Sequence, residues 1–302
     1  MRVIDIFMML KFANSEEEKT FEKVFQVLPD LIKNKCGGYD ELYGYKMNPE
    51  DKDENTKKFY DEVTAKALIY KLCKATNFNY QETVDRFVEI MKWRSKFNPL
   101  SAAFLESHNK ELKGVGILTS YPTEESNKKV VTWNLYGQLV KKKHLFKDAD
   151  KFIRYRIGLM ERGLRLLNFT DDTNCFMTQV HDYKGVSVLR MDSDIKKCTK
   201  QVIAIFQQYY PELLFAKFFI NVPTLLSWVY DLVRAFVDKE TMKKFVVLND
   251  GSKLGTYLSS CPKDPYGGKD VNNSLQGENV ADVRPTEYAL FLLESQNNID
   301  IE

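Results

Sequence analysis

Two residues that face the same way on a predicted strand offer the most chemistry in this sequence. Side chains alternate along a strand, so in the segment from Met177 to Tyr183 the residues Gln179, His181 and Tyr183 share one face. A histidine beside a tyrosine can form a hydrogen-bonded pair in the core, which is by far the more frequent case. It can also contact a ligand or a metal ion, and the spacing alone leaves both open.

A second candidate is a cation on a predicted helix over residues 148–167. Arg156 lies at the edge of the apolar stripe of this helix, one turn from both Ile153 and Met160, so its guanidinium should face the interior. Because arginine does not readily lose its charge, it needs an anionic partner there. That partner is either a protein carboxylate, which is the commoner answer, or an acidic group on a bound ligand.

Two further predicted strands place polar residues side by side. Tyr136 shares a face with Thr132, Asn134 and Gln138, and Lys217 shares one with Phe219 and Asn221. If these faces look inward they line a pocket, and if they look outward they are solvated.

The elements that must position these residues change in type along the chain. Apolar residues at helical spacing predict helices over residues 15–33 and from Asn79 onward, so the chain to about Phe97 should be mainly helical. After Asn98-Pro99, short β-rich runs alternate with helical segments, which is typical of an α/β sheet. We therefore expect a helical N-terminal module over residues 1–100 and an α/β domain over 101–302 that ends in a helix over 286–296. The predicted strands span residues 115–119, 130–139, 176–191, 218–222 and 245–248.

Composition excludes several classes of protein. A net charge of +2 over 302 residues gives no sign of a nucleic-acid binder. The five cysteines form no Cys-x-x-Cys pair, which argues against a zinc site or a disulfide framework. The apolar start lacks a signal-peptide cleavage site, and no apolar stretch reaches about 18 residues, so we expect an intracellular protein without a membrane span. The basic run 141–143 could touch an anionic membrane or a ligand phosphate, although such runs are usually solvated.

Several segments of the sequence form recognisable motifs, namely Tyr209-Tyr210-Pro211-Glu212-Leu213, Lys217 to Pro223, Val237 to Phe245, Tyr266-Gly267-Gly268-Lys269, and Leu72 to Phe78 with Trp93-Arg94 downstream. They resemble motifs of the CRAL-TRIO proteins, a family of phosphatidylinositol, retinoid and tocopherol carriers. The resemblance covers the chain from about residue 15 to 295 and implies a CRAL-TRIO lipid-binding domain behind a small helical module. Cys73 and Lys74 depart from the family's usual hydrophobic and arginine residues.

The runs 132–138 and 180–186 resemble one fungal branch of the family more closely, the phosphatidylinositol transfer proteins that also bind haem. This resemblance implies ferric haem b with Tyr183 as its axial ligand and His181 in support. It also implies Tyr136, Arg156 and Lys217 as walls of the haem site, with a haem propionate as the anion beside Arg156. Coordination to a trivalent metal favours the phenolate form of tyrosine, and we expect Arg156 and Lys217 to favour it too.

For the lipid, the resemblance implies that Glu212 and Lys244 contact the inositol headgroup. Lysine can pair with the phosphate, and glutamate can accept hydrogen bonds from ring hydroxyls. The amphipathic segment from Leu225 to Val237 should act as a mobile lid, with Leu226, Val229, Val233 and Phe236 as its apolar face.

These observations predict a carrier and not an enzyme. It would bind haem, exchange phosphatidylinositol between membranes and act in phosphoinositide homeostasis or the oxidant stress response. We expect it in the cytoplasm, in peripheral contact with the endoplasmic reticulum or other intracellular membranes. The alternatives are a haem-dependent redox enzyme or oxidant sensor, and a scaffold that presents ligand to a lipid kinase.

Overall fold

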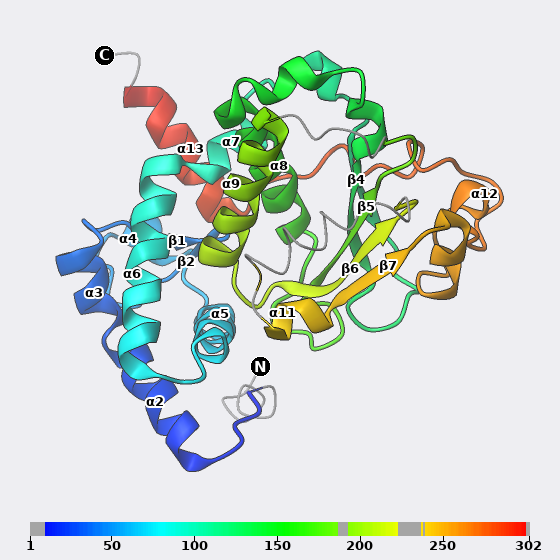
Figure 1. Ribbon diagram of the computed structural model, residues 1–302. Helices are drawn as coiled ribbons and strands as arrows, with labels where there is room; N and C mark the ends of the chain where they lie inside the picture. Colours follow the sequence, from blue (N-terminus) through cyan, green and yellow to red (C-terminus); the bar gives the residue numbers. More distant parts are fainter. Residues whose placement is uncertain (1–9, 187–192, 223–236, 238, 300–302) are drawn as a thin grey trace.

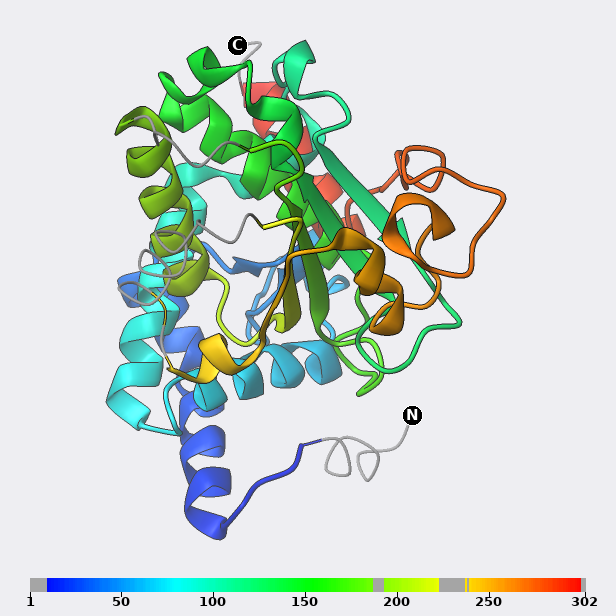
Figure 2. The ribbon, with the colours of Figure 1, turned by 45° about the vertical axis from the view of Figure 1, so that its right-hand side comes forward.

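The computed structural model describes residues 10–186, 193–222, 237 and 239–299, and its first part is mainly helical (Figure 1). Polar side chains cap four of these helices at their N-termini, the helix Leu28–Lys35 being the exception; the side chain of Asn14, for example, accepts hydrogen bonds from the backbone N–H groups of Glu16 and Glu17. The elements of this part are α2 (Ser15–Gln26), α3 (Leu28–Lys35), β1 (Glu41–Leu42), β2 (Tyr45–Lys46), α4 (Glu54–Lys57), α5 (Glu62–Ala75) and α6 (Tyr80–Phe97). Helix α5 runs beneath one end of the large sheet of the second part (Figure 2).

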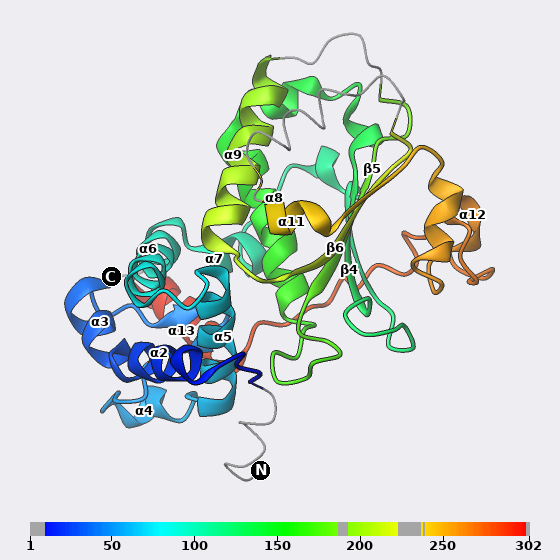
Figure 3. The ribbon, with the colours of Figure 1, turned by 60° about the horizontal axis from the view of Figure 1, so that its bottom comes forward.

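The second part is built on a five-stranded sheet. In spatial order its strands are β3 (Gly116–Ser120), β4 (Val130–Leu135), β5 (Met177–Asp182), β6 (Leu214–Ile220) and β7 (Phe245–Leu248). The pair β3 and β4 is antiparallel, and the other pairs are parallel. Helices α8 (Ala149–Leu164) and α9 (Ser193–Tyr209) lie on one side of the sheet, whereas η4 (Gly251–Thr256) and α12 (Lys263–Tyr266) lie on the other (Figure 3).

The two faces of this sheet differ in polarity because side chains alternate along each strand. On the face toward α12, the side chains of Trp133, Val180 and Phe218 form an apolar core with Leu254 and Tyr266. The face toward α8 carries polar side chains in register, because Asn134 pairs with His181 across β4 and β5, and Gln179 pairs with Lys217 across β5 and β6. The polar face of the sheet is therefore the one covered by α8 and α9, and the apolar face is the one covered by η4 and α12.

Three strands end earlier than the sequence predicts, and one of them, predicted over 218–222, is β6, which spans Leu214–Ile220 and so also begins earlier. The predicted strand 130–139 ends at Leu135 and continues as the 3-10 helix η2 (Tyr136–Leu139). The predicted strand 176–191 ends at Asp182, and the chain then turns at Gly185 with a φ of 81° that favours glycine. The predicted residues 187–191 lie outside the described residues. Tyr136 and Tyr183 thus lie just beyond the ends of neighbouring strands.

A buried ion cluster joins the two parts. Arg94 on α6 donates to both oxygens of Glu41 at 3.0 and 2.7 Å, and to both oxygens of Glu161 on α8 at 2.7 and 3.2 Å. The hydroxyl of Tyr210 also donates to Glu161, at 2.6 Å. Since these groups are almost completely buried, the hydrogen bonds must satisfy the charges that water cannot reach.

The C-terminal helix α13 (Glu287–Ile299) begins one residue after the start of the predicted segment 286–296 and continues past its end; it returns to the N-terminal part, where the hydroxyl of Tyr288 donates to Asp40. The remaining described elements are α7 (Pro99–Phe104), which packs against α8, the 3-10 helices η1 (Lys110–Leu112) and η3 (Lys143–Phe146), and α11 (Lys239–Lys243) before β7. The predicted lid segment lies outside the described residues except for Val237. Within the ranges that the structure describes, no helix is long and apolar enough to cross a bilayer.

Candidate functional site

A cavity of about 900 Å³ lies between the polar face of the sheet and helices α8 and α9. All seven residues that the sequence singled out for ligand contact border it, namely Tyr136, Arg156, His181, Tyr183, Glu212, Lys217 and Lys244. They come from η2, α8, β5, the turn after β5, the segment before β6, β6 itself and the segment before β7. The structure thus brings together residues that are more than 100 positions apart in the chain, while their individual roles stay predictions.

An aromatic group stands at the end of the cavity where β4, β5 and β6 finish. The ring of Tyr136 is 5.1 Å from that of His181 and 5.6 Å from that of Tyr183, measured between centroids. Phe219 on β6 adds contacts at 5.5 Å with His181 and 6.3 Å with Tyr183. These rings offer the flat apolar surface that a planar hydrophobic ligand needs.

Two cations lie over this aromatic group. The guanidinium of Arg156 is 5.9 Å from the ring of Tyr136, and the ammonium of Lys217 is 5.4 Å from the ring of Phe219. Arg156 is only 4% exposed, and its Nε has no hydrogen-bond partner among the described residues. Within that same part of the chain, no carboxylate forms an ion pair with Arg156 or Lys217. The protein carboxylate that the sequence left open for Arg156 is therefore not found there.

Burial sets the protonation of these groups. It raises the pKa of Tyr183 well above the ordinary phenol value, with Tyr136 adding to the effect and Arg156 opposing it. Burial, Lys217 and Arg156 together hold the pKa of His181 well below its usual range. Tyr183 is accordingly a neutral phenol in the ligand-free protein, so the expected push of nearby cations toward the phenolate is outweighed by burial.

Lys217 responds to the same environment in the opposite sense. Burial, with the charge of Arg156 adding to it, lowers the pKa of Lys217 to about 7. A buried ammonium next to a guanidinium is costly without an anion nearby. The cavity therefore favours a ligand that brings negative charge to Arg156 and Lys217.

The predicted headgroup residues lie elsewhere on the cavity wall. Lys244 Nζ is 3.7 Å from a carboxylate oxygen of Glu212, whose backbone has a left-handed φ of 51°. The sequence did not reveal Lys71 on α5, which donates to the carbonyl oxygen of Glu212 at 3.2 Å and lies 3.3 Å from the ring centre of Phe176. Its position one residue before the buried Leu72 was the available signal, because a lysine on an apolar helix face needs a polar partner.

The cavity carries an excess of positive charge. Two glutamates and seven basic residues line it, an excess of five positive charges, whereas the whole chain carries +2. The basic residues are Lys74, Arg86, Lys143, Arg156, Lys217, Lys239 and Lys244. Cations gathered in one concave site raise the local concentration of anions. The site is thus suited to an anionic hydrophobic ligand.

These features fit haem on chemical grounds. The Nε of Arg156 and the ring nitrogen Nε2 of His181 are buried polar atoms without a hydrogen-bond partner in the described part of the chain, and the cations Arg156 and Lys217 suit the two propionates of haem. A group of three or more His, Cys, Asp or Glu that could hold a bare metal ion is absent from the described residues. The phenol of Tyr183 stands between the aromatic walls as an available oxygen ligand.

Comparison with known proteins finds family models and similar proteins that match most of the chain. A model of the CRAL/TRIO domain matches residues 115–268, and one of the CRAL/TRIO N-terminal domain matches residues 38–89. Among similar proteins, the phosphatidylinositol transfer protein SFH5 of Vanderwaltozyma polyspora is 63% identical over 97% of this chain and all of its own length. The proteins of the same name in Saccharomyces cerevisiae and Candida albicans are 60% and 36% identical, each over 97% of this chain and over 100% and 93% of their own lengths.

A solved structure agrees in fold. The crystal structure of Sfh5 matches with a TM-score of 0.93 and 60% identity, and the match covers 95% of this chain and 99% of that one. The predicted fold class is confirmed. The names of the relatives are those of transfer proteins and not of enzymes, in agreement with the prediction of a carrier.

Proposed function

The chain belongs to the CRAL/TRIO family, and from this premise we propose that it carries hydrophobic ligands in its cavity, binding ferric haem b through Tyr183 and transferring phosphatidylinositol between membranes. The observation that carries the haem proposal is the pair of cavity cations, the buried Arg156 and the half-buried Lys217, which have no carboxylate partner among the described residues. A ligand with two carboxylates next to a flat apolar ring system would satisfy both the charges and the aromatic walls.

Each residue of the site would have a separate task toward haem. When bound, ferric iron would supply the trivalent charge that makes the phenolate form of Tyr183 favourable despite its burial. His181, held neutral by burial and by the two cations, would support Tyr183 from the adjacent position on the same face. Tyr136 would close the site through its ring contacts with both residues.

The lipid proposal rests on the names of the relatives and on the residues at the other side of the cavity. Lys244 would pair with the phosphate of phosphatidylinositol, and Glu212 would accept hydrogen bonds from the inositol hydroxyls. Lys71 holds the backbone of Glu212 and so would keep its carboxylate in place. Because both sets of residues line one cavity, we expect haem and phosphatidylinositol to exclude each other.

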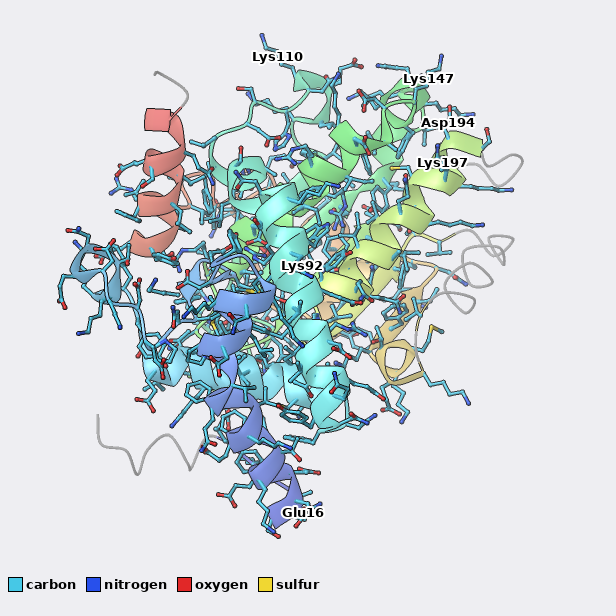
Figure 4. All side chains as sticks on the ribbon, turned by 90° about the vertical axis from the view of Figure 1, so that its left-hand side faces the viewer. Glu16, Lys92, Lys110, Lys147, Asp194 and Lys197 are labelled. Atoms are coloured by element: carbon cyan, nitrogen blue, oxygen red, sulfur yellow. The ribbon has the colours of Figure 1, made fainter. Side chains whose placement is uncertain are left out.

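Contact with membranes follows from the rim of the cavity. Lys74, Lys143 and Lys239 are exposed and also line the cavity, so its opening is surrounded by positive charge. Figure 4 shows two further lysines, Lys147 and Lys197, at the surface around α8 and α9. Each lysine near an anionic bilayer contributes about 1 kcal/mol of attraction. We propose a cytoplasmic protein that touches the endoplasmic reticulum or other intracellular membranes at this rim, with a role in phosphoinositide homeostasis or the oxidant stress response.

The absorption spectrum of the purified protein tests the haem proposal. We expect a Soret band in the wild type, and we expect Tyr183→Phe to lose it while the thermal unfolding curve stays cooperative. Tyr257→Phe is the matched control, because Tyr257 is exposed and packs against Phe218 on the far face of the sheet. Full haem content in a folded Tyr183→Phe protein would refute haem ligation by this residue.

A further inference from the structure

A buried carboxylate lies between the two central residues of the haem site but points the other way. Asp182 separates His181 from Tyr183 and is 6% exposed, on the opposite face of the sheet from the cavity. Its Oδ1 accepts hydrogen bonds from the backbone N–H of Lys184 at 2.8 Å and from Nδ2 of Asn221 at 2.7 Å. Its Oδ2 accepts one from the hydroxyl of Tyr266 at 3.2 Å. None of these bonds reaches the ligand cavity.

The donors to Asp182 are themselves fixed. Asn221, just past the end of β6, has a left-handed φ of 54°, and its Oδ1 accepts a hydrogen bond from the backbone N–H of Gly251 at 2.8 Å. The ring of Tyr266 packs 4.9 Å from that of Trp133 in the apolar core. Asp182 is thus tied to β4, to the end of β6 and to the segment around α12, all of which lie outside the cavity.

A second contact holds the turn after β5 from the other side. Gly137 directly follows Tyr136, and a Cβ atom added to it would lie 1.9 Å from the carbonyl oxygen of Lys184, which directly follows Tyr183. The two backbones therefore touch at the residue after each of the two facing tyrosines. No side chain can be accommodated at position 137 without separating them, because the obstructing atom belongs to the backbone.

Hydrogen bonds of the main chain complete the arrangement. The N–H of Tyr183 donates to the carbonyl oxygen of Ile220 at 3.0 Å, and the N–H of Val186 donates to the carbonyl oxygen of Tyr183 at 2.9 Å. A tyrosine beyond the end of a strand lacks the full ladder that would orient it. Here the missing constraint is supplied by Asp182 on one side and by Gly137 on the other.

We propose that Asp182, Asn221, Tyr266 and Gly137 form a positioning network that holds the ring of Tyr183 against Tyr136 and directs its oxygen into the cavity before any ligand binds. The inference rests on the proposed function, since it assigns the network to the haem ligand Tyr183. A preorganised ligand binds more tightly because no free energy is spent on selecting the competent conformation. None of these four residues needs to contact haem for this effect.

The haem-free protein tests the positioning directly. In protein with labelled tyrosine and histidine rings on a deuterated background, we expect nuclear Overhauser contacts between the rings of Tyr136 and Tyr183, whose centroids are 5.6 Å apart. Asp182→Ala and Gly137→Ala should lose these contacts in folded protein, whereas Asp182→Asn, which keeps an acceptor in the same shape, should retain them. Unchanged contacts in folded Asp182→Ala and Gly137→Ala would overturn the network whether or not haem binds.

Titration with ferric haem tests the consequence. Asp182→Ala and Gly137→Ala should bind at least about tenfold more weakly than wild type, Tyr266→Phe should weaken binding less, and the spectra of the loaded fractions should shift. Asp61→Ala is the control for stability alone, because Asp61 caps helix α5 in the N-terminal part and should lower the melting temperature without changing the spectrum. A wild type that binds no haem defeats the proposed function, and the ring contacts then still decide on the network. Wild-type affinity and spectrum in Asp182→Ala and Gly137→Ala defeat the network alone.

Discussion

Replacing Arg156 by methionine removes the buried charge while it keeps most of the side-chain volume. In the ligand-free protein the guanidinium has no carboxylate partner among the described residues, and its Nε makes no hydrogen bond there. Desolvation of such a charge opposes folding, so its removal should leave the thermal stability of the haem-free protein unchanged or higher. A salt-bridged arginine would show the opposite behaviour.

The effect on haem binding should be large. If Arg156 pairs with a propionate, the variant leaves a buried carboxylate without its counter-charge, a loss of about 2–5 kcal/mol by analogy with other buried pairs. Since about 1.4 kcal/mol corresponds to a factor of ten, haem affinity should fall by roughly 30-fold to several thousand-fold.

Two measurements on one variant decide the matter, namely the melting temperature without haem and the dissociation constant for ferric haem. Arg154→Met is the matched control on the same helix, because Arg154 pairs with Glu106 away from the cavity. It should lower stability modestly and leave haem affinity intact. If Arg156→Met instead loses stability without any loss of haem affinity, the propionate assignment is wrong.

Three further outcomes follow from the site. The pKa of Lys217 is about 7 in the folded protein, against an ordinary value of 10.5, so between these pH values the unfolded chain binds more protons than the folded protein does. The thermal stability of the haem-free protein should therefore rise from pH 7 to 10.5. Lys217→Met should flatten this rise in thermal melts. Glu212→Ala and Lys244→Ala should each lower phosphatidylinositol transfer between vesicles, and unchanged transfer in both would remove the headgroup assignment. His181→Ala should weaken haem binding less than Tyr183→Phe does, as measured by titration, and equal losses would make His181 a ligand in its own right.

The sequence predicted the members of the site better than its geometry. Strand periodicity predicted which neighbours share a face with His181 and with Lys217, and it left open whether the face of Lys217 looks inward; in the structure both residues lie within regular strands and border the cavity. It did not show that Tyr136 and Tyr183 lie beyond strand ends, since a period of two contains no information on where a strand stops. The turn residue Gly185 was the local signal for one of these ends.

Contacts between segments far apart in the chain could not be predicted from the sequence. The approach of Gly137 to the backbone of Lys184 depends on how two turns meet, and no local pattern specifies that distance. The same holds for Lys71, whose partner Glu212 lies 141 positions away. Helix spacing indicates which face of an element is buried, but not which segment buries it.

Helix α8 shows why the missing partner of Arg156 points to a ligand. Five residues beyond Arg156, the same helix carries Glu161, which is buried with Arg94, Glu41 and Tyr210 in a cluster where each charge has partners at hydrogen-bond distance. The fold can therefore supply compensating groups for charges buried on this helix. The guanidinium of Arg156 instead lies 5.9 Å from the ring of Tyr136 and 5.7 Å from that of Phe206, and the charge of Lys217 adds repulsion. The buried charge of Arg156 destabilises the ligand-free protein, and an anionic ligand in the cavity would compensate for this cost when it binds.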